Sequence, residues 1–277
     1  MNITFYGTSG SIPAPGPSRV LVGGNTPCVL VQSDHKHTII LDAGSGLREL
    51  GYRLPKNLDL IDIFISHYHL DHIYGLGFFT PLFEVHREIH IWGPGAQESE
   101  VRSSLNRFLS PPLFPVRLED FKAKVHIHAV PTTSFKRGDF LIDARPIKHS
   151  GLTLGYRLNS NNKILTYLPD HEPFSGQKQL PDRDADISGF ELAHEADLLI
   201  HDAQFTDAEY DEHIGWGHSC ISQTIKFATR CRVKALVTFS HDPSHSDELI
   251  LEMARAANLK AKNFDVAPGI EGQEIII

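Results

Sequence analysis

The sequence has few cysteines, and their positions suggest no shared site. Cys28, Cys220 and Cys231 are odd in number and follow neither a zinc-ribbon nor a redox spacing. We therefore expect buried free thiols in a reducing compartment. The chain also begins without a basic segment followed by a long apolar core, so no signal peptide is expected. These two absences predict a cytoplasmic protein.

Long apolar runs and an excess of basic charge are also missing. No run approaches the ~20 residues that a membrane-spanning helix needs. The formal net charge is -8, which argues against a large basic surface for duplex nucleic acid or for anionic membranes. A small anionic ligand is compatible with this charge, because bound divalent cations would dominate the field inside a pocket.

The 277 residues contain no internal repeat, no low-complexity segment and no clear linker. We therefore expect one domain over residues 1–277. Apolar segments of strand length follow one another early in the chain and alternate with helical patterns later. This order predicts an α/β fold in which two sheets pack between outer helices.

Residues 66–72 concentrate the potential chemistry of the chain. They follow the apolar, β-branched run 61–65, which predicts a buried strand and places them at its carboxyl edge. Imidazole and carboxylate donors suit zinc and related divalent ions. The spacing favours two neighbouring ions, one for each pair of donors, although a solvated polar loop would have the same composition. The four donors are His67, His69, Asp71 and His72.

Further histidines and aspartates follow other predicted strands. Wide gaps separate them, as expected if separate strands deliver ligands to one sheet edge. These residues are His149, Asp170, His201, Asp202 and His241, with His218 added from a loop.

Several polar residues allow a simpler interpretation. His90 alternates with apolar neighbours and is expected to be structural. His126 and His128 share one strand face with no acid beside them, so we expect them at the surface. Asp42 ends a predicted strand and has two equally supported roles, either supporting the metals or capping a helix. The glycine- and proline-rich loop 7–24 lacks the lysine of a P-loop and predicts a structural turn that could rim a pocket.

The pattern His67-x-His69-x-Asp71-His72 resembles the signature of the metallo-β-lactamase superfamily, and the likeness extends over nearly the whole chain. The resemblance implies an αββα sandwich with two divalent metal ions at one edge, zinc being expected and manganese or iron being alternatives. It implies that the first ion binds His67, His69 and His149, the second binds Asp71, His72 and His241, and Asp170 bridges the two.

Residues 201–205 (His-Asp-Ala-Gln-Phe) and 217–219 (Gly-His-Ser) are similar to the ribonuclease Z branch of phosphodiesterases within that superfamily. In that branch an acid orients a histidine that protonates the leaving oxygen, and the resemblance gives these roles to Asp202 and His218. This chain has aspartate where ribonuclease Z has glutamate. Stacking of His218 on Trp216 is the structural alternative. The catalytic candidates are Asp71, Asp202 and His218.

The segment between His149 and Asp170 bears on the substrate. Ribonuclease Z inserts a long arm there that grips transfer RNA, whereas here only 21 positions separate the two residues and they predict one tight hairpin. The chain is thus more similar to the smaller phosphodiesterases of this branch, including anti-Pycsar enzymes that open cyclic nucleotides. Those enzymes are homodimers, so a homodimer is expected here.

The expected reaction is hydrolysis of a small phosphodiester, with a cyclic nucleotide as the leading substrate, by a hydroxide held between the two ions. Four alternatives stay open. They are a thioester or lactone hydrolase on the same fold, a tRNA 3′-processing endonuclease, a di-iron oxidoreductase, and a metal-stabilised ligand sensor without turnover. The di-iron branch has glutamate where His69 stands here, which disfavours that alternative.

Overall fold

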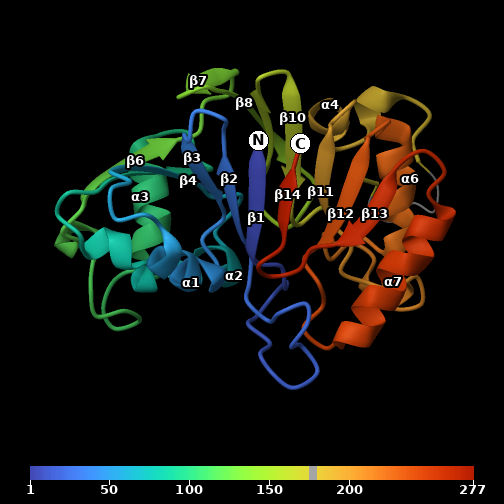
Figure 1. The fold of residues 1–277 in the computed structure, drawn as a ribbon, viewed down its shortest axis with the longest axis horizontal. Helices are drawn as coiled ribbons and strands as arrows, with labels where there is room; N and C mark the ends of the chain where they lie inside the picture. The colour runs from blue at the N-terminus through green and yellow to red at the C-terminus, as the bar shows by residue number, and fades with distance from the viewer. Residues whose placement is uncertain (175–179) are drawn as a thin grey trace.

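The computed structural model describes residues 1–174 and 180–277. Two seven-stranded sheets pack face to face, and helices cover their outer faces (Figure 1). The first sheet has the spatial order β14 (Glu274–Ile276), β1 (Asn2–Gly7), β2 (Cys28–Gln32), β3 (Thr38–Leu41), β4 (Leu60–Phe64), β5 (Glu88–Gly93) and β6 (Lys124–Ala129). The second has the order β13 (Asp265–Pro268), β12 (Ala235–Phe239), β11 (Leu198–Asp202), β10 (Lys163–Leu168), β9 (Thr153–Ser160), β8 (Phe140–Ile147) and β7 (Phe135–Arg137).

Helices lie on the outer sides of both sheets (Figure 1). They are α1 (Gly46–Arg53), α2 (Leu70–Ile73), α3 (Glu98–Asn106), α4 (Phe190–Ala193), α5 (Tyr210–His213), α6 (Ile221–Cys231) and α7 (Asp247–Lys260). Short 3-10 turns lie at Tyr74–Phe78, Thr80–Phe83, Leu118–Asp120 and Asp184–Asp186. The predicted αββα sandwich is therefore confirmed.

Strand direction brings distant parts of the chain to one edge. In the first sheet β3, β4, β5 and β6 run parallel. In the second, β10, β11, β12 and β13 run parallel, and β8 shares their direction because β9 lies antiparallel between β8 and β10. The carboxyl ends of β4, β8, β10, β11 and β12 precede or carry the predicted site residues, so the topology gathers those residues at the ends of the strands.

Aromatic side chains fill the space between the sheets. Phe239 of the second sheet packs against Phe5 of the first, with ring centroids 6.2 Å apart, and against Tyr167 at 5.6 Å. Phe64 meets Tyr156 across the same interface at 5.6 Å. All of these rings are essentially inaccessible to solvent. Both tyrosine hydroxyls donate a hydrogen bond at the edge of this core. Tyr156 donates to the carbonyl of Ile65 at 2.6 Å, and Tyr167 donates to Asp42 at 2.8 Å.

The three cysteines are buried and free, as the sequence predicts. Among the described residues, no helix combines the length and apolar character needed to cross a bilayer.

Replacing Phe239 with alanine tests the packing between the sheets. We expect Phe239→Ala to lower the free energy of unfolding by about 3–5 kcal/mol, because it leaves a cavity between two sheets that cannot collapse freely. Urea unfolding followed by circular dichroism measures the loss. Leu259→Ala is the control, since Leu259 is 87% exposed and its truncation should change stability by less than about 0.5 kcal/mol. Equal stability of the two variants would contradict this assignment of the core.

Candidate metal centre

Six of the seven predicted ligands gather at the edge where the strands end. The six fall into two groups, and within each group the donor atoms lie within 4.8 Å of one another. The first contains His67, His69, His149 and Asp170, and the second contains Asp71, His72 and Asp170. Asp170 belongs to both groups, in keeping with the bridging position that the family resemblance implies.

The donor atoms of both groups converge on one carboxylate oxygen. The Nε2 atoms of His67 and His149 each lie 3.6 Å from Oδ2 of Asp170. Nε2 of His72 lies 3.3 Å from the same oxygen and 3.2 Å from Oδ2 of Asp71. In the first group, Nδ1 of His69 lies 3.3 Å from Nε2 of His149.

The buried nitrogens here fit a metal ion. Nε2 of His67 and Nε2 of His72 are both buried and make no hydrogen bond, although an unpaired buried polar atom costs about 1–3 kcal/mol. Burial and the charge on neighbouring His72 hold the pKa of His67 well below its usual value, which keeps that imidazole neutral with a lone pair available. Imidazole and carboxylate donors around orphaned nitrogens suit divalent ions of the zinc type.

The opposite ring nitrogens are held by partners outside the centre. Nδ1 of His72 lies 2.7 Å from Oδ2 of Asp42, and Nδ1 of His149 donates to the carbonyl of Gly217 at 2.8 Å. Nδ1 of His67 lies 3.0 Å from the hydroxyl of Ser66. Such contacts fix the orientation of a ligating imidazole and direct its other nitrogen towards the metal.

Asp42 contacts a candidate metal ligand, as the first of its two predicted roles requires. Besides His72, it accepts hydrogen bonds from the backbone N–H of Ser66 at 2.6 Å, the Ser66 hydroxyl at 2.8 Å and the Tyr167 hydroxyl at 2.8 Å. The N-cap position of helix α1 is held by Ser45, whose side chain makes no capping hydrogen bond, and not by Asp42. The Asp42 carboxylate therefore supports the histidine cluster and does not cap the helix.

His241 lies outside both groups of donors among the described residues. It is buried, and its Nε2 donates to the carbonyl of Gly269 at 3.0 Å. Because a carbonyl only accepts, Nε2 carries the proton and Nδ1 carries the lone pair. Its neighbour Ser240 faces the centre, with its hydroxyl 3.3 Å from Oδ1 of Asp170. Ligation by His241 stays a prediction.

Asp202 and His218 form a buried pair beside the donors. Oδ2 of Asp202 lies 2.6 Å from Nδ1 of His218, and both residues are within reach of Asp170. Burial opposes the charged imidazolium, but the Asp202 carboxylate outweighs it and raises the pKa of His218 to about 9. The alternative of His218 stacked on Trp216 is not observed, because the described ring partner of Trp216 is His213.

The loop at residues 7–24 rims the centre. The backbone N–H of Ser11 donates to Oδ2 of Asp71 at 2.9 Å, and that of Gly10 donates to the carbonyl of His241 at 2.9 Å. The loop thus contacts both a candidate ligand and the strand end that carries another.

Sequence reasoning missed Glu172. Its buried carboxylate accepts from the Tyr210 hydroxyl at 2.5 Å and from the backbone N–H groups of Gly215 and Gly217 at 3.0 Å each. It thereby holds the loop that carries His218. Gly217 has φ +88°, and a Cβ there would lie 2.4 Å from Nδ1 of His149. The only signal in the sequence was an acid two positions after Asp170.

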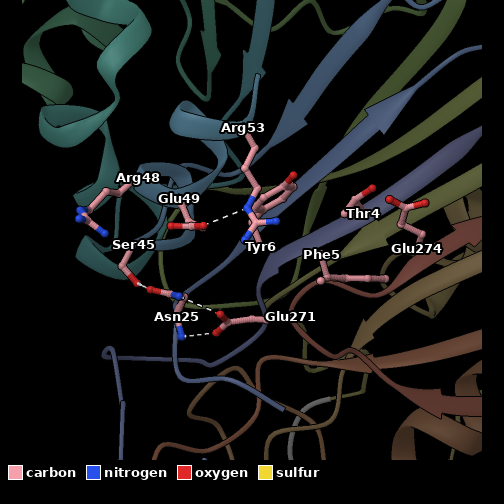
Figure 2. Close-up of a pocket in the computed structure, with 11 residues that line it drawn as sticks. Thr4, Phe5, Tyr6, Asn25, Ser45, Arg48, Glu49, Arg53, Glu271 and Glu274 are labelled. Atoms are coloured by element: carbon pink, nitrogen blue, oxygen red, sulfur yellow. Dashed lines mark hydrogen bonds and ion pairs between the residues drawn. The ribbon is translucent and has the colours of Figure 1, made fainter. Parts of the chain in front are cut away.

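Two cavities differ in their relation to this centre. One of about 360 Å³ opens beside His67 and His69 and is also lined by Tyr68, Pro94 and Leu152. Another, of about 510 Å³, lies between β1, α1 and the turn at Glu271, and Figure 2 shows its charged lining with an Arg53–Glu49 ion pair. None of the candidate ligands lines the second cavity, so the first is the candidate substrate pocket.

Comparison with known proteins identifies the family. A model of the β-lactamase superfamily domain matches residues 37–241. A ribonuclease Z of Picrophilus torridus is 25% identical over 297 aligned residues, covering 92% of this chain and 90% of that protein. The metallo-β-lactamase fold protein YhfI of Bacillus subtilis superposes with a TM-score of 0.71 at 20% identity, covering 99% of this chain and 98% of the other. The short form of human tRNase Z superposes with a TM-score of 0.68 at 22% identity, covering 100% of this chain and 99% of the other.

We expect Asp42→Asn to weaken metal binding by about 10–100-fold, because the variant keeps the shape of the side chain but removes the charge that orients His72. Competition with a chromophoric chelator measures the zinc affinity. Asp59→Asn, at an exposed aspartate outside the centre, is the control for the change in net charge. An unchanged affinity in Asp42→Asn would show that Asp42 does not support the metals.

Proposed function

This chain belongs to the β-lactamase superfamily, and we propose that it is a metal-dependent phosphodiesterase that hydrolyses a small phosphodiester, with a cyclic nucleotide as the leading substrate. The observation that carries the proposal is the buried Asp202–His218 pair, which places an oriented proton donor beside Asp170. Hydrolases that expel a good leaving group have no need of such a donor, whereas an alkoxide leaving from phosphorus does.

The metal ions would bind through the two groups of donors around Asp170. Divalent cations at these positions would offset the charge of a phosphate and activate water for attack. Zinc is the proposed metal, with manganese and iron as alternatives that the same donors accept. Asp42, Ser66 and the Gly217 carbonyl would hold the histidine rings in position for this role.

His218 would act on the leaving group. Its Nδ1 is engaged by Asp202, so the other ring nitrogen, Nε2, is the one available to protonate a departing oxygen. The raised pKa of about 9 keeps His218 protonated at neutral pH, which suits a general acid. Asp202 is itself fixed, since its Oδ1 accepts from the backbone N–H groups of Gln204 and Ser219 at 3.0 Å each.

Three features support a small substrate. The segment between His149 and Asp170 consists of the paired strands β9 and β10 with a short turn, which leaves no chain for an arm that grips RNA. The cavity beside His69 has about 360 Å³, at the lower end of the ~300–1,000 Å³ typical of small-ligand sites. The net charge of -8 also disfavours a long polyanion.

We also propose that the protein is a homodimer. Light scattering tests this by measuring the molar mass in solution.

The relatives named ribonuclease Z support a second candidate, cleavage of RNA at phosphodiester bonds. A substrate panel separates the candidates. We expect the zinc-loaded protein to turn over cyclic mono- or dinucleotides at least ~10-fold faster than a precursor tRNA, a thioester or a lactone, because the pocket is small and the site holds a proton donor. Faster cleavage of the precursor tRNA would favour the endonuclease, and faster turnover of the thioester or lactone would contradict phosphodiesterase activity.

His218→Ala tests the proton donor. We expect kcat for a cyclic nucleotide to fall by about 10²–10⁴-fold with the metal content unchanged. The loss should be much smaller for bis-p-nitrophenyl phosphate, because p-nitrophenolate departs without protonation. His35→Ala, at an exposed hairpin tip, controls for removal of an imidazole. Equal losses on both substrates, or none on either, would show that His218 does not protonate the leaving group.

A further inference from the structure

A second cluster of histidines lies on the first sheet, within strands β5 and β6. These strands pair in parallel, with His90 opposite His126 and Trp92 opposite His128. Ile89, Ile91 and Ile127 point to the opposite face and are buried in the core under the helices. The alternation of a strand therefore places Glu88 and the three histidines together on the other face of the sheet.

The donor atoms of this cluster lie close enough to share an ion. Oε1 of Glu88 is 3.1 Å from Nε2 of His126 and 3.4 Å from Nε2 of His90, and one donor atom from each of the three residues lies within 4.8 Å of the others. Nε2 of His126 is buried and makes no hydrogen bond, because its contact with Glu88 lacks hydrogen-bond geometry. This unsatisfied nitrogen is the same kind of signal that marks the centre around Asp170.

His128 supplies the partner that orients one of these rings. Its Nε2 lies 2.8 Å from Nδ1 of His90. With Nδ1 of His90 as the donor, Nε2 of the same ring has its lone pair free on the side of Glu88. This is the arrangement in which an outer hydrogen bond fixes the tautomer of a ligating histidine.

We propose that Glu88, His90 and His126 form an additional metal site that takes Zn²⁺ or a similar divalent ion. Two imidazoles and one carboxylate are the donors of three-ligand zinc sites, in which water completes the coordination. The rings of His90 and His126 are stacked at 4.5 Å with an angle of 13° between them, so binding turns them until both nitrogens converge on the ion. Lys124, whose Nζ lies 3.3 Å from Oε1 of Glu88, is displaced.

The site is separate from the centre around Asp170. Glu88 is the first residue of β5, whereas the cluster of residues 67–72 follows the last residue of the parallel strand β4. The two sites therefore lie towards opposite ends of the strands. Since β6 is the edge strand of its sheet, an ion held by Glu88, His90 and His126 cross-links the edge strand to its neighbour, and this role does not depend on the proposed phosphodiesterase activity.

Counting bound zinc tests the proposal. The protein is equilibrated with Zn²⁺ at increasing free concentration, and bound zinc is measured by native mass spectrometry. We expect the double variant His90→Ala/His126→Ala to hold one zinc ion fewer per chain than the wild type at saturation. The double variant His35→Ala/His86→Ala, which removes two exposed histidines outside the cluster, should hold the same number as the wild type. Equal zinc in all three proteins would overturn the proposal.

If the double variant His90→Ala/His126→Ala does not fold, a second variant still tests the proposal. Glu88→Gln keeps both rings and is expected to weaken binding of the additional ion without reducing phosphodiesterase turnover. In wild-type protein whose centre around Asp170 is already loaded with zinc, further Zn²⁺ should bind the additional site and raise Tm by cross-linking β5 to β6. This rise should be absent in Glu88→Gln. A Tm rise of the same size in both proteins would overturn the proposal, whatever the outcome of the activity assays.

Discussion

The carboxylate of Asp42 is the contact on which the centre depends. It is buried without access to solvent, and it binds the end of β4 through Ser66, the histidine cluster through His72 and the second sheet through Tyr167. Its backbone has φ +59°, a conformation that aspartate tolerates better than most residues. Because these partners come from both sheets, the geometry of the donors is set only when the sandwich has closed.

The part of the site that follows the strands was predictable from sequence. Each strand that ends in histidine or aspartate is recognisable by its apolar run, and parallel strands bring those ends to one edge. The role of Asp42 could be narrowed only to two options, since its position at a strand end fits both. The αββα sandwich itself followed from the order of the elements and from the resemblance carried by residues 67–72.

Contacts made across the sequence were not predictable. Glu172 holds Gly217 from 45 positions away, and no local pattern encodes that pairing. His126 was expected to have no acid beside it, but the β5–β6 register brings Glu88 to 3.1 Å. In both cases the partner is set by how strands and loops align in three dimensions, and single-sequence periodicity reports only which face a residue occupies.

The loop held by Glu172 contributes two adjacent residues to the centre. The carbonyl of Gly217 orients His149, and the very next residue is His218. A displacement of this loop would therefore move a candidate ligand and the proposed proton donor at the same time. Under the proposed function, metal affinity and the rate of leaving-group departure would change together when this loop changes. Adaptation to a new leaving group would then proceed through residues outside the loop, such as those that line the cavity beside His69.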